Sequence, residues 1–70
     1  MIKNKLSVII PVYNEEKTVI QTLKRIQETY DKRVDYEIIV INDGSYDDTP
    51  NLLKSNTDLY HQLINNKKNP

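Results

Sequence analysis

The sequence contains no cysteine and a single glycine, Gly44, among its 70 residues. Without cysteine the chain can form neither a disulfide nor a thiolate-bound zinc site, and its one histidine, His61, cannot build a metal site without carboxylates. One glycine is too few for the G-x-G-x-x-G turn of dinucleotide-binding domains or for a P-loop, both of which cradle phosphate groups. Disulfide-rich folds and these two glycine-rich phosphate sites are therefore excluded.

An excess of charge of either sign is also missing, since ten basic side chains balance ten acidic ones. Balanced charge argues against a partner that is bound through bulk electrostatics, such as duplex DNA or an anionic membrane. No apolar run approaches the roughly 20 residues that span a bilayer, and the charged N-terminus leads into a short mixed segment rather than a signal sequence. We therefore expect no nucleic-acid partner, no transmembrane segment and a cytoplasmic location.

The N-terminal part of the chain predicts a buried strand followed by an amphipathic helix. The run Leu6–Val12 is almost continuously apolar, as in strands covered on both faces of a parallel sheet, and its proline lies near the end, where a missing N–H is tolerated. Asn14 is the predicted N-cap of the helix, with Glu15 and Glu16 in the first turn, where carboxylates favour the helix dipole. The apolar stripe of this helix consists of Val19, Ile20, Leu23, Ile26 and Tyr30.

A second strand and a second helix follow a polar connection at residues 31–33. The apolar stretch Tyr36–Ile41 predicts a buried strand that stops at the turn Asn42–Ser45. The second helix is predicted to have Thr49 as its N-cap and Pro50 as its first residue. Its predicted buried side chains are Leu52 and Leu53.

The segment that follows is ambiguous, because Leu59–Ile64 can form a third strand or continue the helix; we favour the strand. In the polar tail, Lys67 and Lys68 are expected to lie in a solvated loop rather than in a phosphate site. Asp47 and Asp48 invite a metal-binding interpretation, but carboxylates just before a helix ordinarily favour its N-terminus.

The order β-α-β-α-(β) predicts an α/β fold with a parallel sheet, because a right-handed crossover makes the consecutive strands parallel. In open sheets of this kind, ligands bind beyond the carboxyl ends of the strands. The polar stretches Pro11–Glu15 and Asn42–Ser45 each end a strand. We therefore expect both of them at that end of the sheet.

Both stretches contain side chains that suit a nucleotide. Asp43 can accept hydrogen bonds from the N–H groups of a base or from ribose hydroxyls, as can Glu15. Tyr13 offers a flat face on which a base can stack, a contact worth about 1–3 kcal/mol. Each stretch also has a plainer interpretation, since Asn42–Ser45 is typical of turns and Asn14 with Glu15 can simply begin a helix. Tyr13 would then only cover the edge of the core.

The two stretches together are more specific than either one alone. The segment LSVIIPVYNEEKTVIQTLKRI, followed by YEIIVINDGSYDDTPNLLK, strongly resembles the start of the family 2 glycosyltransferases. The resemblance covers about Leu6–Ser55, and residues 56–70 look like the strand and loop that come next. It implies that residues 1–70 are a truncated N-terminal part of a Rossmann-like GT-A catalytic domain.

In that family this part of the fold holds the nucleotide. The resemblance implies that Tyr13 lies at the base and that Asp43 binds the base or the ribose. Asn42 stands where the family commonly has aspartate, so hydrogen bonding is kept and a charge is lost. The implied nucleotide-binding residues are Pro11, Tyr13, Glu15, Asn42, Asp43, Gly44 and Ser45, and no catalytic residue is implied.

The family's D-x-D motif, which holds a divalent metal ion against the sugar nucleotide, does not occur in this sequence. The resemblance implies Mg²⁺ or Mn²⁺ for a full-length parent, with no ligand for the metal and no catalytic base in this chain. Without charge compensation on the diphosphate and without a base, the chain alone is expected to be inactive. The expected parent transfers a sugar from a UDP- or GDP-linked donor to a lipid phosphate, glycan or protein, in the cytoplasm or at the cytoplasmic face of a membrane.

Two other functions stay open at this point. A non-catalytic nucleotide-binding module, or a remnant of an enzyme, would keep nucleotide binding without sugar transfer. A flavodoxin-like domain would bind flavin, although the phosphate loop expected after its first strand is missing from this sequence.

Overall fold

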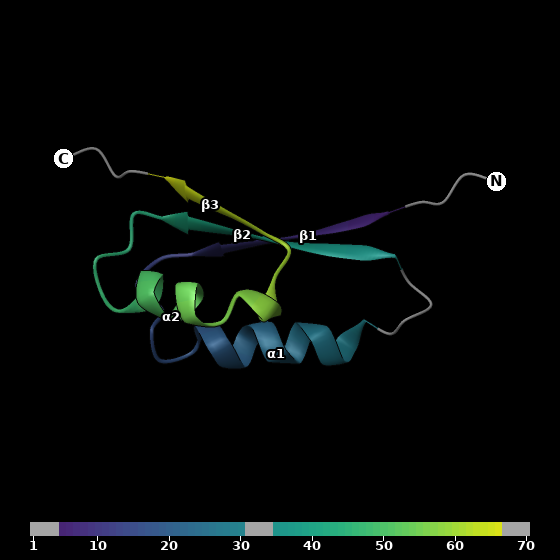
Figure 1. Ribbon diagram of the computed structural model, residues 1–70, viewed down its shortest axis with the longest axis horizontal. Helices are drawn as coiled ribbons and strands as arrows, with labels where there is room; N and C mark the ends of the chain where they lie inside the picture. The colour runs from purple at the N-terminus through teal and green to yellow at the C-terminus, as the bar shows by residue number, and fades with distance from the viewer. Residues whose placement is uncertain (1–4, 31–34, 67–70) are drawn as a thin grey trace.

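The computed structural model describes residues 5–30 and 35–66. In chain order the elements are β1 (Leu6–Val12), α1 (Val19–Thr29), β2 (Tyr36–Asp43), α2 (Thr49–Ser55), the short 3-10 helix η1 (Thr57–Leu59) and β3 (Gln62–Asn66). The predicted order β-α-β-α-β is confirmed, including the third strand (Figure 1). The predicted connection at 31–33 and the predicted solvated pair Lys67 and Lys68 lie outside the described residues.

The three strands form one parallel sheet in the order β1-β2-β3, so β2 lies in the middle. Ile9 of β1 pairs with Ile39 of β2, which pairs in turn with Gln62 of β3. Both helices lie on the same side of this sheet (Figure 1). The predicted parallel α/β fold is thus the observed one. None of the described helices is long and apolar enough to cross a bilayer.

The core fills the space between the sheet and the helices. Its fully buried apolar side chains are Val19, Leu23, Ile38, Val40 and Leu53. Side chains at the intervening strand positions point to the opposite face of the sheet, because successive residues of a strand alternate in direction. On that face Ile9 is 50% exposed and Ile64 is 40% exposed. The apolar run of β1 predicts cover on both faces, but the described elements cover only one (Figure 1).

The start of α1 differs from the prediction. Regular helix begins at Val19, with Thr18 as N-cap and no acidic residue in the first turn, so Asn14 is not the N-cap. Glu15 and Glu16 lie before the helix. The N–H groups of Thr18 and Val19 both donate to the carbonyl oxygen of Glu15, which closes a turn ahead of the helix. The backbone N–H groups of residues 14–16 donate instead to side chains of residues 45–49, which follow β2. These bonds hold the segment in a non-helical conformation.

The boundaries of β2 and α2 are displaced by one or two residues. β2 continues to Asp43 rather than ending at Ile41, because Asn42 pairs with β1 on one side and with β3 on the other. α2 has Asp48 as its N-cap, so Thr49 is its first residue and not its cap. Both differences move polar residues of the turn into regular structure.

The third strand begins later than predicted. β3 starts at Gln62, whereas Leu59 belongs to η1 and closes the core from there at 5% exposure. The hydroxyl of Tyr60 donates to the carbonyl oxygen of Leu53 at 2.9 Å and ties this connection to α2. The two leucines of α2 are not equivalent, since Leu53 is fully buried and Leu52 only partly.

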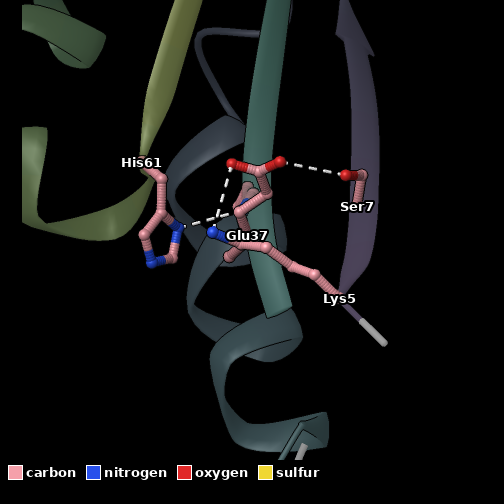
Figure 2. Close-up of polar contacts among 5 residues, drawn as sticks. Lys5, Ser7, Glu37 and His61 are labelled. Atoms are coloured by element: carbon pink, nitrogen blue, oxygen red, sulfur yellow. Dashed lines mark hydrogen bonds and ion pairs between the residues drawn. The ribbon is translucent and has the colours of Figure 1, made fainter. Parts of the chain in front are cut away.

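Side-chain contacts hold the other end of the sheet, where β1 and β2 begin (Figure 2). The hydroxyl of Ser7 donates to Oε1 of Glu37 at 3.0 Å, and Nζ of Lys5 lies 3.8 Å from Oε2 of the same carboxylate. The N–H of Ile38 donates to Nδ1 of His61 at 2.9 Å, and the N–H of His61 donates back to the Ile38 carbonyl oxygen at 2.9 Å. β3 starts only at Gln62, the residue after His61. The imidazole of His61 therefore supplies to the N–H of Ile38 the acceptor that a carbonyl of a paired strand would otherwise provide. His61, which has no predicted function, therefore has a structural one.

Candidate functional site

Two loops meet beyond the carboxyl ends of β1 and β2 (Figure 1). The first loop comprises residues 13–18, between β1 and α1, and the second comprises residues 44–48, between β2 and α2. They are in direct contact although 31 residues separate Asn14 from Ser45. The polar stretches identified in the sequence thus lie at the expected end of the sheet and beside each other.

Asn14 is the main link between the loops. Its backbone N–H donates to Oγ of Ser45 at 2.9 Å, and its side-chain Oδ1 accepts from the N–H of Tyr46 at 2.9 Å and from the N–H of Asp47 at 3.3 Å. Its φ of 49° lies in the left-handed region, which asparagine adopts more readily than most residues. This role was not predicted, and the only signal for it in the sequence is an asparagine in a turn that lacks glycine.

A second link runs through the start of α2. Oγ1 of Thr49, which is fully buried, accepts from the N–H of Glu15 at 3.0 Å. The carboxylate of Asp47 accepts from the N–H of Glu16 at 3.2 Å and from the N–H of Thr49 at 2.9 Å. The expectation that Asp47 serves the start of the second helix is therefore correct, and the same carboxylate also holds the first loop.

Asn42 and Gly44 shape the second loop from within. Asn42 is 5% exposed; its Oδ1 accepts from the N–H of Ser45 at 3.2 Å and its Nδ2 donates to Oδ1 of Asn65 at 3.0 Å. An aspartate carboxylate could not make the second of these bonds as a donor. Gly44 has a φ of 79°, which glycine adopts without a steric penalty. The buried side chain of Asn42 therefore links the second loop to β3 through both ends of its amide.

Other predicted residues face solvent around the junction of the loops. Pro11, Tyr13, Glu15 and Asp43 are all exposed. Tyr46 is exposed as well, and its ring lies 6.2 Å from that of Tyr13, centre to centre, with 78° between the ring planes. The exposed groups thus include two aromatic rings, those of Tyr13 and Tyr46, and the carboxylates of Glu15 and Asp43. Such a set can stack on a planar ring and accept hydrogen bonds from N–H or hydroxyl groups.

The described residues do not offer a metal site. Among residues 5–30 and 35–66, no three Asp, Glu or His side chains come close enough together to hold an ion. A shallow hollow of about 370 Å³ lies elsewhere, along α1. It is lined from that helix and the residue before it, by Thr18, Gln21, Thr22, Arg25, Ile26 and Thr29. All of these described lining residues come from one helix and its N-cap, so this hollow differs from the junction where two loops bring polar groups together.

The hydrogen bonds around Asp47 affect its ionisation. Partial desolvation raises the pKa of this carboxyl, but hydrogen bonds from the hydroxyl and N–H of Thr49 and from the N–H of Glu16 outweigh it. The pKa of Asp47 therefore lies below its ordinary value of 3.8.

This lowered pKa predicts a pH-dependent contribution to stability. A carboxyl whose pKa is lower in the folded state stabilises the fold when ionised, so the contribution is complete above the unfolded pKa of 3.8 and is lost as the pH falls through the folded pKa. We expect Asp47→Asn to be less stable than the wild type near pH 7, with a smaller difference near pH 2. Urea unfolding at both pH values measures this. A stability difference that does not change with pH would contradict it.

Comparisons with known proteins point to one group of enzymes. Residues 7–69 match the family model described as Glycosyl transferase family 2. The chain is 44% identical over 52 residues to an undecaprenyl-phosphate 4-deoxy-4-formamido-L-arabinose transferase of Proteus mirabilis, a match covering 73% of this chain and 16% of that protein. It is 37% identical over 59 residues to the uncharacterized glycosyltransferase YkcC of Bacillus subtilis, covering 83% of this chain and 17% of that protein.

A third relative gives the same result. The probable glycosyltransferase YdaM of Bacillus subtilis is 41% identical over 56 residues, covering 80% of this chain and 13% of that protein. No solved structure matches the chain significantly. The chain spans about one sixth of the length of the first two relatives, so it corresponds to a small part of each.

Proposed function

Because the chain belongs to glycosyl transferase family 2, we propose that its two joined loops bind the nucleoside diphosphate part of a nucleotide sugar. The observation that carries the proposal is the hydrogen-bonded junction of the loops at the carboxyl end of the sheet. Tyr13 and Asp43 are exposed at this end, one from each β-strand terminus. Ligands of open parallel sheets bind in this position.

Each exposed residue has a chemical role in this proposal. The ring of Tyr13 stacks on the base, and the carboxylate of Asp43 accepts hydrogen bonds from base N–H groups or ribose hydroxyls. Glu15 is a second acceptor, and Pro11 lies beside the bound nucleotide. The remaining residues act indirectly, by giving the second loop its shape: Asn42, Gly44 and Ser45.

In the complete enzyme the bound nucleotide is the leaving group of a sugar transfer. We propose a lipid phosphate, glycan or protein as the acceptor; the name of the Proteus mirabilis relative, an undecaprenyl-phosphate transferase, favours a lipid phosphate. That reaction would take place in the cytoplasm or at the cytoplasmic face of a membrane. The chain described here is proposed to contribute nucleotide binding and, by itself, no sugar transfer.

Nucleotide binding is tested by titrating the purified chain with UDP and with GDP in a calorimeter. We expect a micromolar dissociation constant for at least one of them. Tyr13→Ala is expected to raise that constant about 5- to 150-fold, because truncating a stacking ring costs about 1–3 kcal/mol. Asp43→Ala is expected to raise it about 10- to 150-fold, since a hydrogen bond to a charged group is worth about 1.5–3 kcal/mol.

Asp58→Ala is the matched control for Asp43→Ala, because Asp58 is an exposed aspartate in η1, outside both loops. It should leave the affinity unchanged. Failure of the wild type to bind either nucleotide would contradict the proposed function, and so would an equal loss in the control. Sugar transfer by this chain from UDP- or GDP-linked sugars would contradict the proposal that the chain alone is inactive. Flavin binding would favour the flavodoxin-like alternative.

A further inference from the structure

Tyr46 lies exposed in the second loop, beside Tyr13. It is 81% exposed, more than any other large apolar side chain of the described residues. A tyrosine ring combines a large apolar face with a polar hydroxyl, which suits contact with a ligand when the ring is exposed. Its place in the second loop, one residue after Ser45, puts it at the junction of the two loops.

The backbone that carries Tyr46 is held firmly. Its N–H donates to Oδ1 of Asn14 at 2.9 Å, and the next N–H, that of Asp47, donates to the same oxygen at 3.3 Å. On its other side, Oγ of Ser45 accepts from the N–H of Asn14 at 2.9 Å. Three consecutive residues are thus attached to the first loop, so little backbone freedom is left to lose when a ligand binds.

The ring of Tyr46 also has a defined relation to that of Tyr13. The ring centres are 6.2 Å apart and the planes meet at 78°, an edge-to-face arrangement. Two rings at nearly a right angle form a corner. A planar base that stacks on one wall of such a corner meets the other wall with its edge, which is itself a favourable aromatic geometry.

We propose that Tyr46 is a base-contacting residue, and that with Tyr13 it forms a two-walled aromatic corner for the nucleobase of the bound nucleoside diphosphate. This inference rests on the proposed function of the two loops. The corner recognises the base as a planar ring and leaves recognition of its N–H groups, and of the ribose, to the carboxylates.

The test uses the full chain, with UDP and GDP as probes, and compares Tyr46→Ala, Tyr46→Leu and Tyr46→Phe. We expect the dissociation constant to rise about five- to tenfold in the alanine and leucine variants and to change less than twofold in the phenylalanine variant, because only the last keeps an aromatic wall. Base protons of the bound nucleotide should show a ring-current shift by NMR that is smaller in Tyr46→Ala. Thermal unfolding is expected to be unaffected in all three variants, since the side chain is exposed.

The outcomes separate the two ideas. If the wild type binds neither UDP nor GDP, the proposed function fails and this inference fails with it. If the wild type binds but Tyr46→Ala or Tyr46→Leu binds equally well, the inference alone is overturned. An unchanged ring-current shift in Tyr46→Ala would also overturn it, whatever the affinity, because the ring would then not lie beside the base.

Discussion

Replacing Asn14 by glycine is expected to lower the free energy of unfolding by about 1–3 kcal/mol and to weaken nucleotide binding about tenfold. Glycine adopts a φ of 49° without strain, so the backbone is preserved and the loss comes from the side chain. The N–H groups of Tyr46 and Asp47 lose their shared acceptor, and the two loops are then joined by fewer bonds. Urea unfolding measures the stability, and calorimetry with UDP or GDP measures the affinity.

Asn14→Asp is the matched control for this change. Aspartate keeps an oxygen acceptor and also tolerates the left-handed region, so it should retain most of the stability and affinity lost in the glycine variant. The measurement belongs in moderate salt, which screens repulsion between the new carboxylate and that of Asp47. If glycine and aspartate at position 14 behave alike, the side chain of Asn14 does not link the loops as inferred.

Replacing Leu53 by alanine is expected to cost about 2–5 kcal/mol of stability, the usual range for emptying a fully buried leucine site. Leu53 is 0% exposed and lies in α2, which has only seven residues and depends on the core for its stability. A domain of this size has a total stability of roughly 4–10 kcal/mol, so the variant should be partly or largely unfolded at 37 °C. Circular dichroism during thermal and urea unfolding measures the loss.

The neighbouring leucine supplies the comparison. Leu52 lies in the same helix, one residue earlier, but is only partly buried. Leu52→Ala removes the same atoms and changes helix propensity equally, so it should cost clearly less than Leu53→Ala. Equal losses would mean that burial in the core does not set the contribution of these side chains.

The regular elements were predictable because their signals are local. The apolar runs of β1 and β2 mark them as strands, and the spacing of Val19, Leu23 and Ile26 marks α1 as a helix with one buried stripe. The parallel arrangement follows from the handedness of the crossover. Since each polar stretch directly follows one of these parallel strands, both stretches must lie at the carboxyl end of the sheet.

The details of the site were not predictable because its bonds join residues far apart in the chain. Asn14 looks like a helix cap in the sequence, and only the fold brings it to Tyr46 and Asp47, 32 and 33 residues later. Thr49 also looks like a helix cap in the sequence, but in the fold its hydroxyl oxygen accepts from the N–H of Glu15, 34 residues earlier. In both cases a tertiary bond replaced the local one that the pattern favours.

The pairing of Ile9 with Ile39 has a consequence for synthesis on the ribosome. Strand β1 emerges first but finds its partner only after 30 further residues, which takes roughly 1.5–6 s at about 5–20 residues per second. During that interval the apolar segment Leu6–Val12 is an unpaired extended chain. Hydrophobic segments exposed in this way are prone to aggregate, so the first strand is the part of the nascent chain that gains most from chaperone binding before β2 is made.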